Sequence, residues 1–147
     1  LLVHGLGEHA GNYTELADQL NHWGFAVRAY DQYGHGDSSG QRGDVPHVDR
    51  LMLDLATVID DTRTLLDDRL PLILLGHGIG ALVAARLVGQ KLRRVDGLVI
   101  SSPAFSVCSR IGQAQLLRAM TMVAPQLPLE NRMIPEDLTH DLQAIET

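Results

Sequence analysis

The chain has 147 residues and a formal net charge of −6, and 45% of its residues are hydrophobic. This length suits one domain with a sizeable core. The negative charge disfavours nucleic acid as the main partner, and no apolar stretch of about 18 residues predicts a membrane span. Cys108 is the single cysteine, so the sequence excludes an intrachain disulfide framework and a thiolate metal cluster.

The two ends of the sequence resemble the interior of a domain. Leu1 begins inside an apolar run without an initiator methionine, and Thr147 follows no capping or closing signal. We therefore expect the chain to be part of a longer domain. A leader or anchor before Leu1 stays open, and we expect a cytoplasmic or peripheral-membrane location.

The first part of the chain alternates between apolar runs and a helical pattern. Residues 1–3 predict a buried strand. Asn12 and Glu15 then predict a capping pair for a helix that ends at Gly24. A second apolar run predicts another strand over residues 25–30.

The same alternation continues in the middle of the chain, with a helix expected at 51–65, a strand at 72–75, a helix at 79–90 and a strand at 98–101. Apolar strands that alternate with helices indicate a parallel sheet covered on both faces. Ligands bind such sheets beyond the carboxyl ends of the strands. Six acidic residues are expected on a solvated helix face: Asp49, Asp54, Asp60, Asp61, Asp67 and Asp68.

The composition changes after Pro103. Residues 111–124 are rich in leucine and methionine, and prolines and a more polar tail follow them. We expect a cap or lid here, whose methionines adapt to an alkyl chain; an ordinary packing helix is the alternative. The predicted organisation is thus a partial core over 1–103 and a partial cap over 104–147.

Residues 76–80 lie between an expected strand and an expected helix. In the nucleophile elbow G-x-S-x-G, outer glycines allow close packing and a central serine on a strained turn exposes the attacking oxygen. Gly76 and Gly80 fit the outer positions, and Gly78 occupies the place of the serine. Because glycine adopts positive φ without steric cost, this residue relieves backbone strain but lacks the attacking atom.

Three other interpretations of this segment compete with the elbow. A plain glycine-rich turn needs no chemistry. Gly76, Gly78 and Ala81 also match the dinucleotide pattern G-x-G-x-x-A. The acid that this pattern requires, Asp96, precedes the strand 98–101, so we expect it at the wrong edge of the sheet. A phosphate loop is excluded because no Gly-Lys-Ser/Thr follows.

The loop 5–10 is a second match to G-x-G-x-x-A, and Asp31 follows the strand 25–30, where a ribose-binding acid belongs. Against this dinucleotide site, Glu8 would place negative charge beside a pyrophosphate that requires positive potential. The alternative is an oxyanion hole. Its two backbone N–H donors would come from Leu6 and from Ile79, the residue after the nucleophile position.

Three segments in fixed order resemble one family. They are His4-Gly5-Leu6-Gly7-Glu8-His9, the loop from Asp31 to Gly40, and Gly76-His77-Gly78-Ile79-Gly80. They are similar to the HGxGEH, D-x-x-GHGxSxG and GHSxG signatures of the monoacylglycerol lipase and lysophospholipase branch of the α/β-hydrolases, a serine aminopeptidase S33-like family. The resemblance covers essentially the whole chain and implies a fragment of the α/β-hydrolase fold, with a mostly parallel sheet, helices on both faces and the start of a helical cap.

The resemblance implies hydrolysis of single-chain lipid esters such as monoacylglycerols or lysophospholipids by a Ser-His-Asp triad, without metal or organic cofactor. Peripheral membrane contact through the cap would accompany that role. Gly78 takes the nucleophile position, Leu6 and Ile79 match the oxyanion donors, and the acid and histidine are expected beyond Thr147. We therefore expect this chain to be inactive. A non-catalytic lipid-binding relative and a dinucleotide-binding domain stay open as alternatives.

The histidines near the expected site are assigned a structural role. His4, His9, His35 and His77 all belong to the matching segments, and none occupies the catalytic histidine position of the family. His4 and His9 lack the helical spacing and the third ligand of a metal site. We expect these four side chains to hydrogen-bond the loops.

Overall fold

The computed structural model describes residues 1–44, 47, 49–67 and 69–103. The expected cap, residues 104–147, lies outside the described residues, so the boundary between core and cap stays a prediction. No helix among the described residues is long and apolar enough to cross a membrane.

The described residues form a parallel sheet of three strands in the order β1-β2-β3. The strands are β1 (Leu2–Val3), β2 (Ile73–His77) and β3 (Gly97–Ser101). The register pairs Leu2 with Leu75 and His77 with Ser101. The strands expected at 1–3, 72–75 and 98–101 are confirmed, and their carboxyl ends reach one edge of the sheet.

The strand expected over residues 25–30 is wrong in its extent. Only Ala29 pairs, through an isolated parallel bridge to Leu2, supported by the Leu2 N–H donating to the Arg28 carbonyl at 2.8 Å. The neighbouring β1 has two residues and offers few partners for a longer ladder. Phe25 at the start of this segment is 50% exposed.

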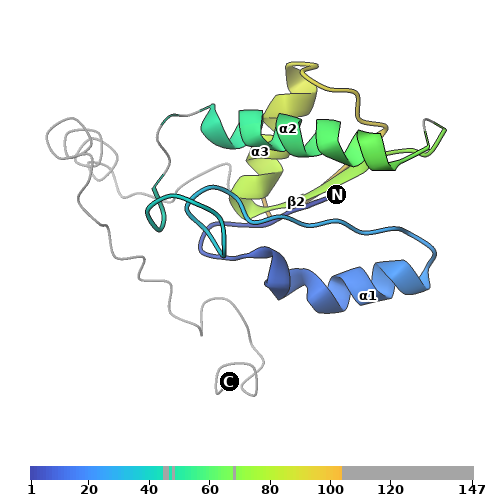
Figure 1. The fold of residues 1–147 in the computed structure, drawn as a ribbon, viewed down its shortest axis with the longest axis horizontal. Helices are drawn as coiled ribbons and strands as arrows, with labels where there is room; N and C mark the ends of the chain where they lie inside the picture. The colour runs from blue at the N-terminus through green and yellow to red at the C-terminus, as the bar shows by residue number, and fades with distance from the viewer. Residues whose placement is uncertain (45–46, 48, 68, 104–147) are drawn as a thin grey trace, which may run out of the picture. The chain divides into compact units, whose positions relative to one another are not determined.

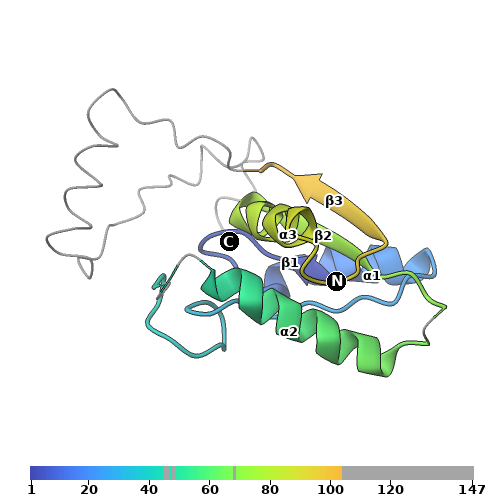
Figure 2. The same cartoon turned by 90° about the horizontal axis from the view of Figure 1, so that it is seen from above.

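Helices lie on both faces of the sheet, as expected. Figure 1 shows α2 and α3 on one side of β2 and α1 on the other, and Figure 2 shows α3 above β2 and beside β3. The helices are η1 (Ala10–Tyr13, 3-10), α1 (Thr14–His22), α2 (Arg50–Leu65) and α3 (Gly78–Gly89). The core lies between the sheet and α2 with α3, where Leu55, Ile59, Leu74 and Leu87 are fully buried.

The capping pair expected at Asn12 and Glu15 is wrong, because the chain already turns into the short helix η1 at Ala10. His9 is the N-cap: its imidazole accepts a hydrogen bond from the Gly11 N–H, and Asn12 Oδ1 accepts one from the His9 N–H. Imidazole is not among the usual capping groups, so the sequence did not predict His9 as an N-cap.

The acidic face of α2 is exposed but paired. Four of its expected acids form ion pairs with arginines: Asp49 with Arg86, Asp54 with Arg50, Asp60 with Arg93 and Asp61 with Arg28. Exposed pairs of this kind contribute about 0 to 1 kcal/mol each. The pair of Arg50 and Asp54 lies within α2, and the other three pairs connect this part of the chain to neighbouring segments. The apolar core supplies most of the stability.

Helix α3 begins directly at the end of β2 and lies against β1. A Cβ atom on Gly80 would overlap the carbonyl oxygens of Val3 and His4. A Cβ atom on Gly76 would lie 2.6 Å from the Cα of Ala81. Both positions therefore require glycine, which confirms the packing role expected for the outer glycines of the elbow.

We predict that Gly80→Ala destabilises the protein by about 1 to 3 kcal/mol, since the added methyl must separate α3 from the β1 backbone. Gly89→Ala is the matched control, because Gly89 lies in the same helix and a Cβ atom there would have no neighbour within 4 Å. We expect it to be neutral or slightly stabilising. Urea unfolding measures both. Equal stability of the two variants would contradict the close approach.

Candidate functional site

The local structure of the elbow is the expected strand, tight turn and helix. His77 ends β2 with extended backbone, and Gly78 follows at φ +53° as the first residue of α3. This left-handed conformation suits glycine and strains other residues. A Cβ atom on Gly78 would have one neighbour, the Gly5 Cα at 3.5 Å, which is ordinary contact. The position thus has room for a side chain.

The loop after β1 lies opposite Gly78 and is closed by Glu8. One carboxylate oxygen of Glu8 accepts hydrogen bonds from the Gly5 N–H and from the Tyr13 hydroxyl, both at 2.6 Å. Burial raises the pKa of Tyr13, and its hydrogen bond to Glu8 raises it further. Because the Gly5 N–H is bonded to Glu8, the next N–H along the loop that could act as a donor to a ligand is that of Leu6.

Two backbone N–H groups near the elbow have no acceptor in the regular structure. Within the part of the chain that the structure describes, the Leu6 N–H makes no hydrogen bond. Ile79 is the second residue of α3, and the first four N–H groups of a helix lack an intrahelical acceptor. Gly5 meets Gly78 at the junction of these two segments. The residues that precede Leu6 and Ile79 are thus close to each other, and the oxyanion role of Leu6 and Ile79 stays a prediction.

The Asp31 carboxylate connects two loops. Asp31 Oδ1 accepts from the Ala10 N–H, and Asp31 Oδ2 accepts from the Asp37 N–H, both at 2.7 Å. The bond from Ala10 is the largest cause of the lowered pKa of Asp31. Gly36 leaves room for this carboxylate, because a Cβ atom there would overlap it. Asp31 therefore holds the protein's own backbone.

The four histidines of the matching segments all hydrogen-bond, as expected. His4 bonds Gly5 and Gln32, His9 caps η1, His35 bonds the Tyr33 carbonyl, and His77 Nδ1 lies 3.1 Å from the Ser101 hydroxyl. The partners Gln32 and Ser101 were not anticipated. Ser101 had a usable signal, since it ends an expected strand beside the elbow strand, whereas the buried Gln32 has none in a single sequence.

The geometry at Asp96 fits the expectation that it lies away from the elbow. Its carboxylate accepts from the Leu72 N–H before β2 and pairs with Arg63, and these bonds lower its pKa to about 2. Asp96 thus lies at the amino-terminal edge of the sheet, opposite the elbow. Among the described residues no group of three or more His, Cys, Asp or Glu side chains is placed to hold a metal ion.

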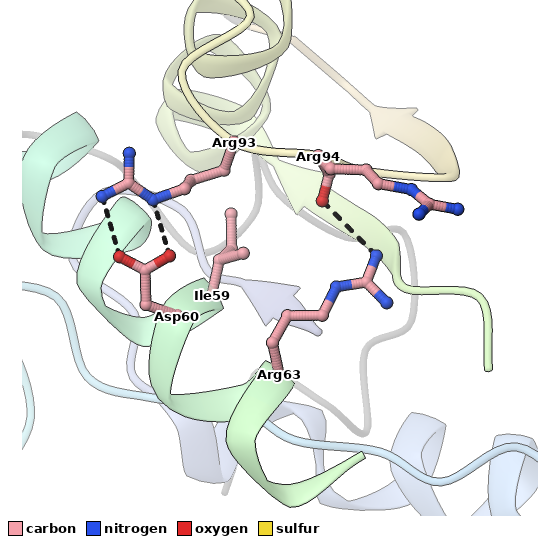
Figure 3. A pocket seen from close by; sticks show the side chains of 5 residues that line it. All are labelled: Ile59, Asp60, Arg63, Arg93 and Arg94. Carbon is pink, nitrogen blue, oxygen red and sulfur yellow. Dashed lines mark hydrogen bonds and ion pairs between the residues drawn. The ribbon is translucent and has the colours of Figure 1, made fainter. Parts of the chain in front are cut away.

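A surface hollow of about 440 Å³ also lies outside the elbow region. Figure 3 shows its lining residues, Ile59, Asp60, Arg63, Arg93 and Arg94. Arg93 forms two hydrogen bonds with Asp60, and Arg63 bonds the Arg94 carbonyl and Asp96. The guanidinium groups of Arg63 and Arg93 are thus hydrogen-bonded to carboxylates and carbonyls of the chain itself. We assign these residues of the hollow a structural role.

Comparisons with known proteins identify the family of the chain. The family model described as serine aminopeptidase, S33 matches residues 1–147. Phospholipase YtpA of Bacillus subtilis is 28% identical over 149 residues, which cover 99% of this chain and 56% of YtpA. A monoacylglycerol lipase of Mycolicibacterium smegmatis is 33% identical over 141 residues, covering 89% of this chain and 47% of that protein.

A solved structure supports the same family at the level of the fold. The monoacylglycerol lipase of Paleococcus ferrophilus superposes with a TM-score of 0.83 at 33% identity, over 99% of this chain and 55% of that one. The chain thus spans about half the length of these three relatives. It belongs to the serine aminopeptidase S33 family and is a fragment of the α/β-hydrolase fold in the monoacylglycerol lipase branch.

Proposed function

We propose that the chain carries part of a carboxylic-ester hydrolase site of the monoacylglycerol lipase type, and that it does not hydrolyse esters as it stands. The observation that carries this proposal is Gly78. It has the φ of +53° and the open space of an elbow residue, next to the Gly5 loop, but no side-chain oxygen. The left-handed turn of an elbow is therefore present without a nucleophile.

The proposed substrate is a single-chain lipid ester such as a monoacylglycerol or lysophospholipid. The names of the relatives support this class, since they include monoacylglycerol lipases and a phospholipase. A cytoplasmic or peripheral-membrane location, with contact with a membrane surface through residues 104–147, belongs to the same proposal.

The proposed chemistry requires an oxygen at position 78. A serine there would attack the ester carbonyl, and the Leu6 and Ile79 N–H groups would stabilise the resulting oxyanion. The acid and the histidine that activate the serine are expected beyond Thr147. Removing the serine of such a triad costs on the order of 10⁶ in turnover.

A non-catalytic acyl-binding role is the second candidate. It is favoured by the two uncommitted N–H groups at Leu6 and Ile79 and by the space beside Gly78. An acyl carbonyl accepts hydrogen bonds from such donors whether or not a nucleophile is present. This role requires binding without turnover.

We predict that an alkyl fluorophosphonate probe does not label the chain, because no activated serine is available. Gel fluorescence and mass spectrometry after incubation with the probe measure this. The Paleococcus ferrophilus relative serves as the labelled control. Covalent labelling at any residue of this chain would overturn the proposed lack of activity.

The complementary prediction concerns Gly78→Ser in a version extended past Thr147 by the acid- and histidine-bearing part of a relative. We expect it to gain hydrolysis of monoacylglycerol or short p-nitrophenyl esters by several orders of magnitude over Gly78→Ala, which has the same Cβ but no oxygen. Circular dichroism checks folding of both variants. A folded Ser variant no faster than the Ala variant would refute the assignment of the elbow.

For the acyl-binding role, we predict that a fluorescent acyl amide binds the chain and is displaced by monoacylglycerol, while NAD has no effect. Fluorescence anisotropy measures the displacement. Binding of NAD without binding of the acyl probe would instead favour the dinucleotide interpretation, which requires a free carboxylate at Asp31.

A further inference from the structure

His4 is a buried histidine whose two ring nitrogens have different partners. It follows β1. His4 and Gln32 are each only 1% exposed. His4 Nδ1 lies 2.7 Å from the Gly5 carbonyl, which only accepts, so Nδ1 carries a proton. The Gln32 N–H donates to His4 Nε2 at 2.9 Å, so Nε2 carries a lone pair. Only the neutral Nδ1–H imidazole satisfies both bonds. Gln32 Nε2 also lies 3.4 Å from His4 Nδ1, but its shorter bond is to a carbonyl, so the 2.7 Å bond to Gly5 decides the tautomer.

The backbone of His4 is held by the same neighbours. Gln32 Nε2 donates to the His4 carbonyl at 2.7 Å. Gly80 of α3 packs against that carbonyl with no room for a Cβ atom. The start of the loop that carries Leu6 is therefore attached to the loop of Gln32 on one side and to α3 on the other.

We infer that His4 is a positioning residue for the Gly5–Leu6 backbone. It fixes this backbone only while its imidazole is neutral, so acidification loosens the backbone. The effect on a ligand rests on the proposed function, because it requires the Leu6 N–H as a donor. The link from His4 to Gln32 does not depend on it.

Protonation removes the link directly. An imidazolium has no lone pair, so its Nε2–H would face the Gln32 N–H and one buried donor would lose its acceptor. The Gln32 side chain offers an alternative partner, since its Oε1 is buried without a hydrogen bond among the described residues. A rearranged state with a charged His4 thus has an acceptor close by.

The charges around His4 set the pH range of this change. Burial is the largest cause and lowers the pKa of His4 below its ordinary 6.5, and the nearby His35 lowers it further. The Gly5 carbonyl, Asp31 and Glu8 act in the opposite direction. The ring of His77 lies against Gly5, and the first turn of α3 has no titratable residue.

The direction of the pH dependence follows from this lowered pKa. Well above pH 6.5 His4 is neutral in both the folded and the unfolded chain, and the link is complete. As the pH falls below 6.5, the unfolded chain takes up a proton before the folded chain does. Stability and the link are therefore lost on the acid side.

The test of the link uses nitrogen-15 NMR of the full chain with labelled histidine, together with amide hydrogen exchange. At pH 7.5 we expect His4 as the neutral Nδ1–H tautomer. Between pH 7.5 and the acid form of His4, we expect protection of the hydrogen-bonded Gln32 and Gly5 amides to fall at least tenfold after correction for intrinsic exchange. A charged His4 at pH 7.5, the other tautomer, or pH-independent protection would overturn the inference.

His4→Gln is the variant of choice, because its amide oxygen can accept from the Gln32 N–H and does not titrate. We expect its amide protection to be independent of pH over this range. His22→Gln, on the exposed end of α1, is the matched control and should behave like the parent chain. If His4→Gln fails to fold, the tautomer and exchange measurements on the parent chain still decide the inference.

Oleoyl ethanolamide, an uncharged acyl amide, tests the effect on a ligand. We expect its affinity for the parent chain to fall about tenfold as His4 is protonated, the equivalent of one hydrogen bond, and to stay constant in His4→Gln. Affinity that is equally independent of pH in the parent chain would contradict the positioning role. If the amide does not bind at any pH while the exchange results hold, the proposed function fails and the link stands.

Discussion

The close approach of α3 to β1 is the packing constraint on which the rest of the site depends. It brings the first turn of a helix against the carbonyls of Val3 and His4, at a distance that only a glycine at position 80 permits. Gly5 and Gly78 meet as a result, and with them the loop of Leu6 and the helix start of Ile79. Two segments far apart in the sequence are close together at this junction for this reason.

The polar bonds around this junction stabilise the loops. Glu8 binds a backbone N–H of its own loop, whereas Asp31 and His4 bind backbone N–H groups of a neighbouring loop. A hydrogen bond to a charged group contributes roughly 1.5 to 3 kcal/mol, enough to keep an irregular loop in one conformation. The chain thus keeps the supporting structure of the elbow although position 78 lacks an oxygen. Because a left-handed non-glycine residue costs of order 1 to 3 kcal/mol, glycine at this position favours stability over chemistry.

Much of the fold could be predicted from short-range patterns. The helical spacing over α2 and the apolar runs of β2 and β3 are local signals, and glycine spacing alone indicated the turn at Gly78. Two features could not be predicted this way. The segment 25–30 has the composition of a strand, but its pairing depends on how many residues its neighbour β1 supplies. The N-cap at His9 depends on a 3-10 turn that no composition rule indicates.

In the candidate site, too, some residues could be predicted from local sequence patterns and others could not. The sequence indicated Gly78, Leu6 and Ile79 because their motif positions are fixed along the chain. It did not indicate the link between His4 and Gln32, since that link joins residues 28 positions apart and its strength comes from burial. Asp31 was open to two interpretations, and only its two backbone bonds distinguish a loop anchor from a ribose ligand.

The most direct test of the central claim is carbon-13 NMR of oleoyl ethanolamide, labelled at the carbonyl and bound to this chain. We expect a downfield carbonyl shift, because two N–H donors polarise the oxygen, with the largest amide proton changes at Leu6 and Ile79. A bound carbonyl that keeps its shift in water, or amide changes confined to α2 and the Arg63 hollow, would contradict a preformed oxyanion hole at the vacant elbow.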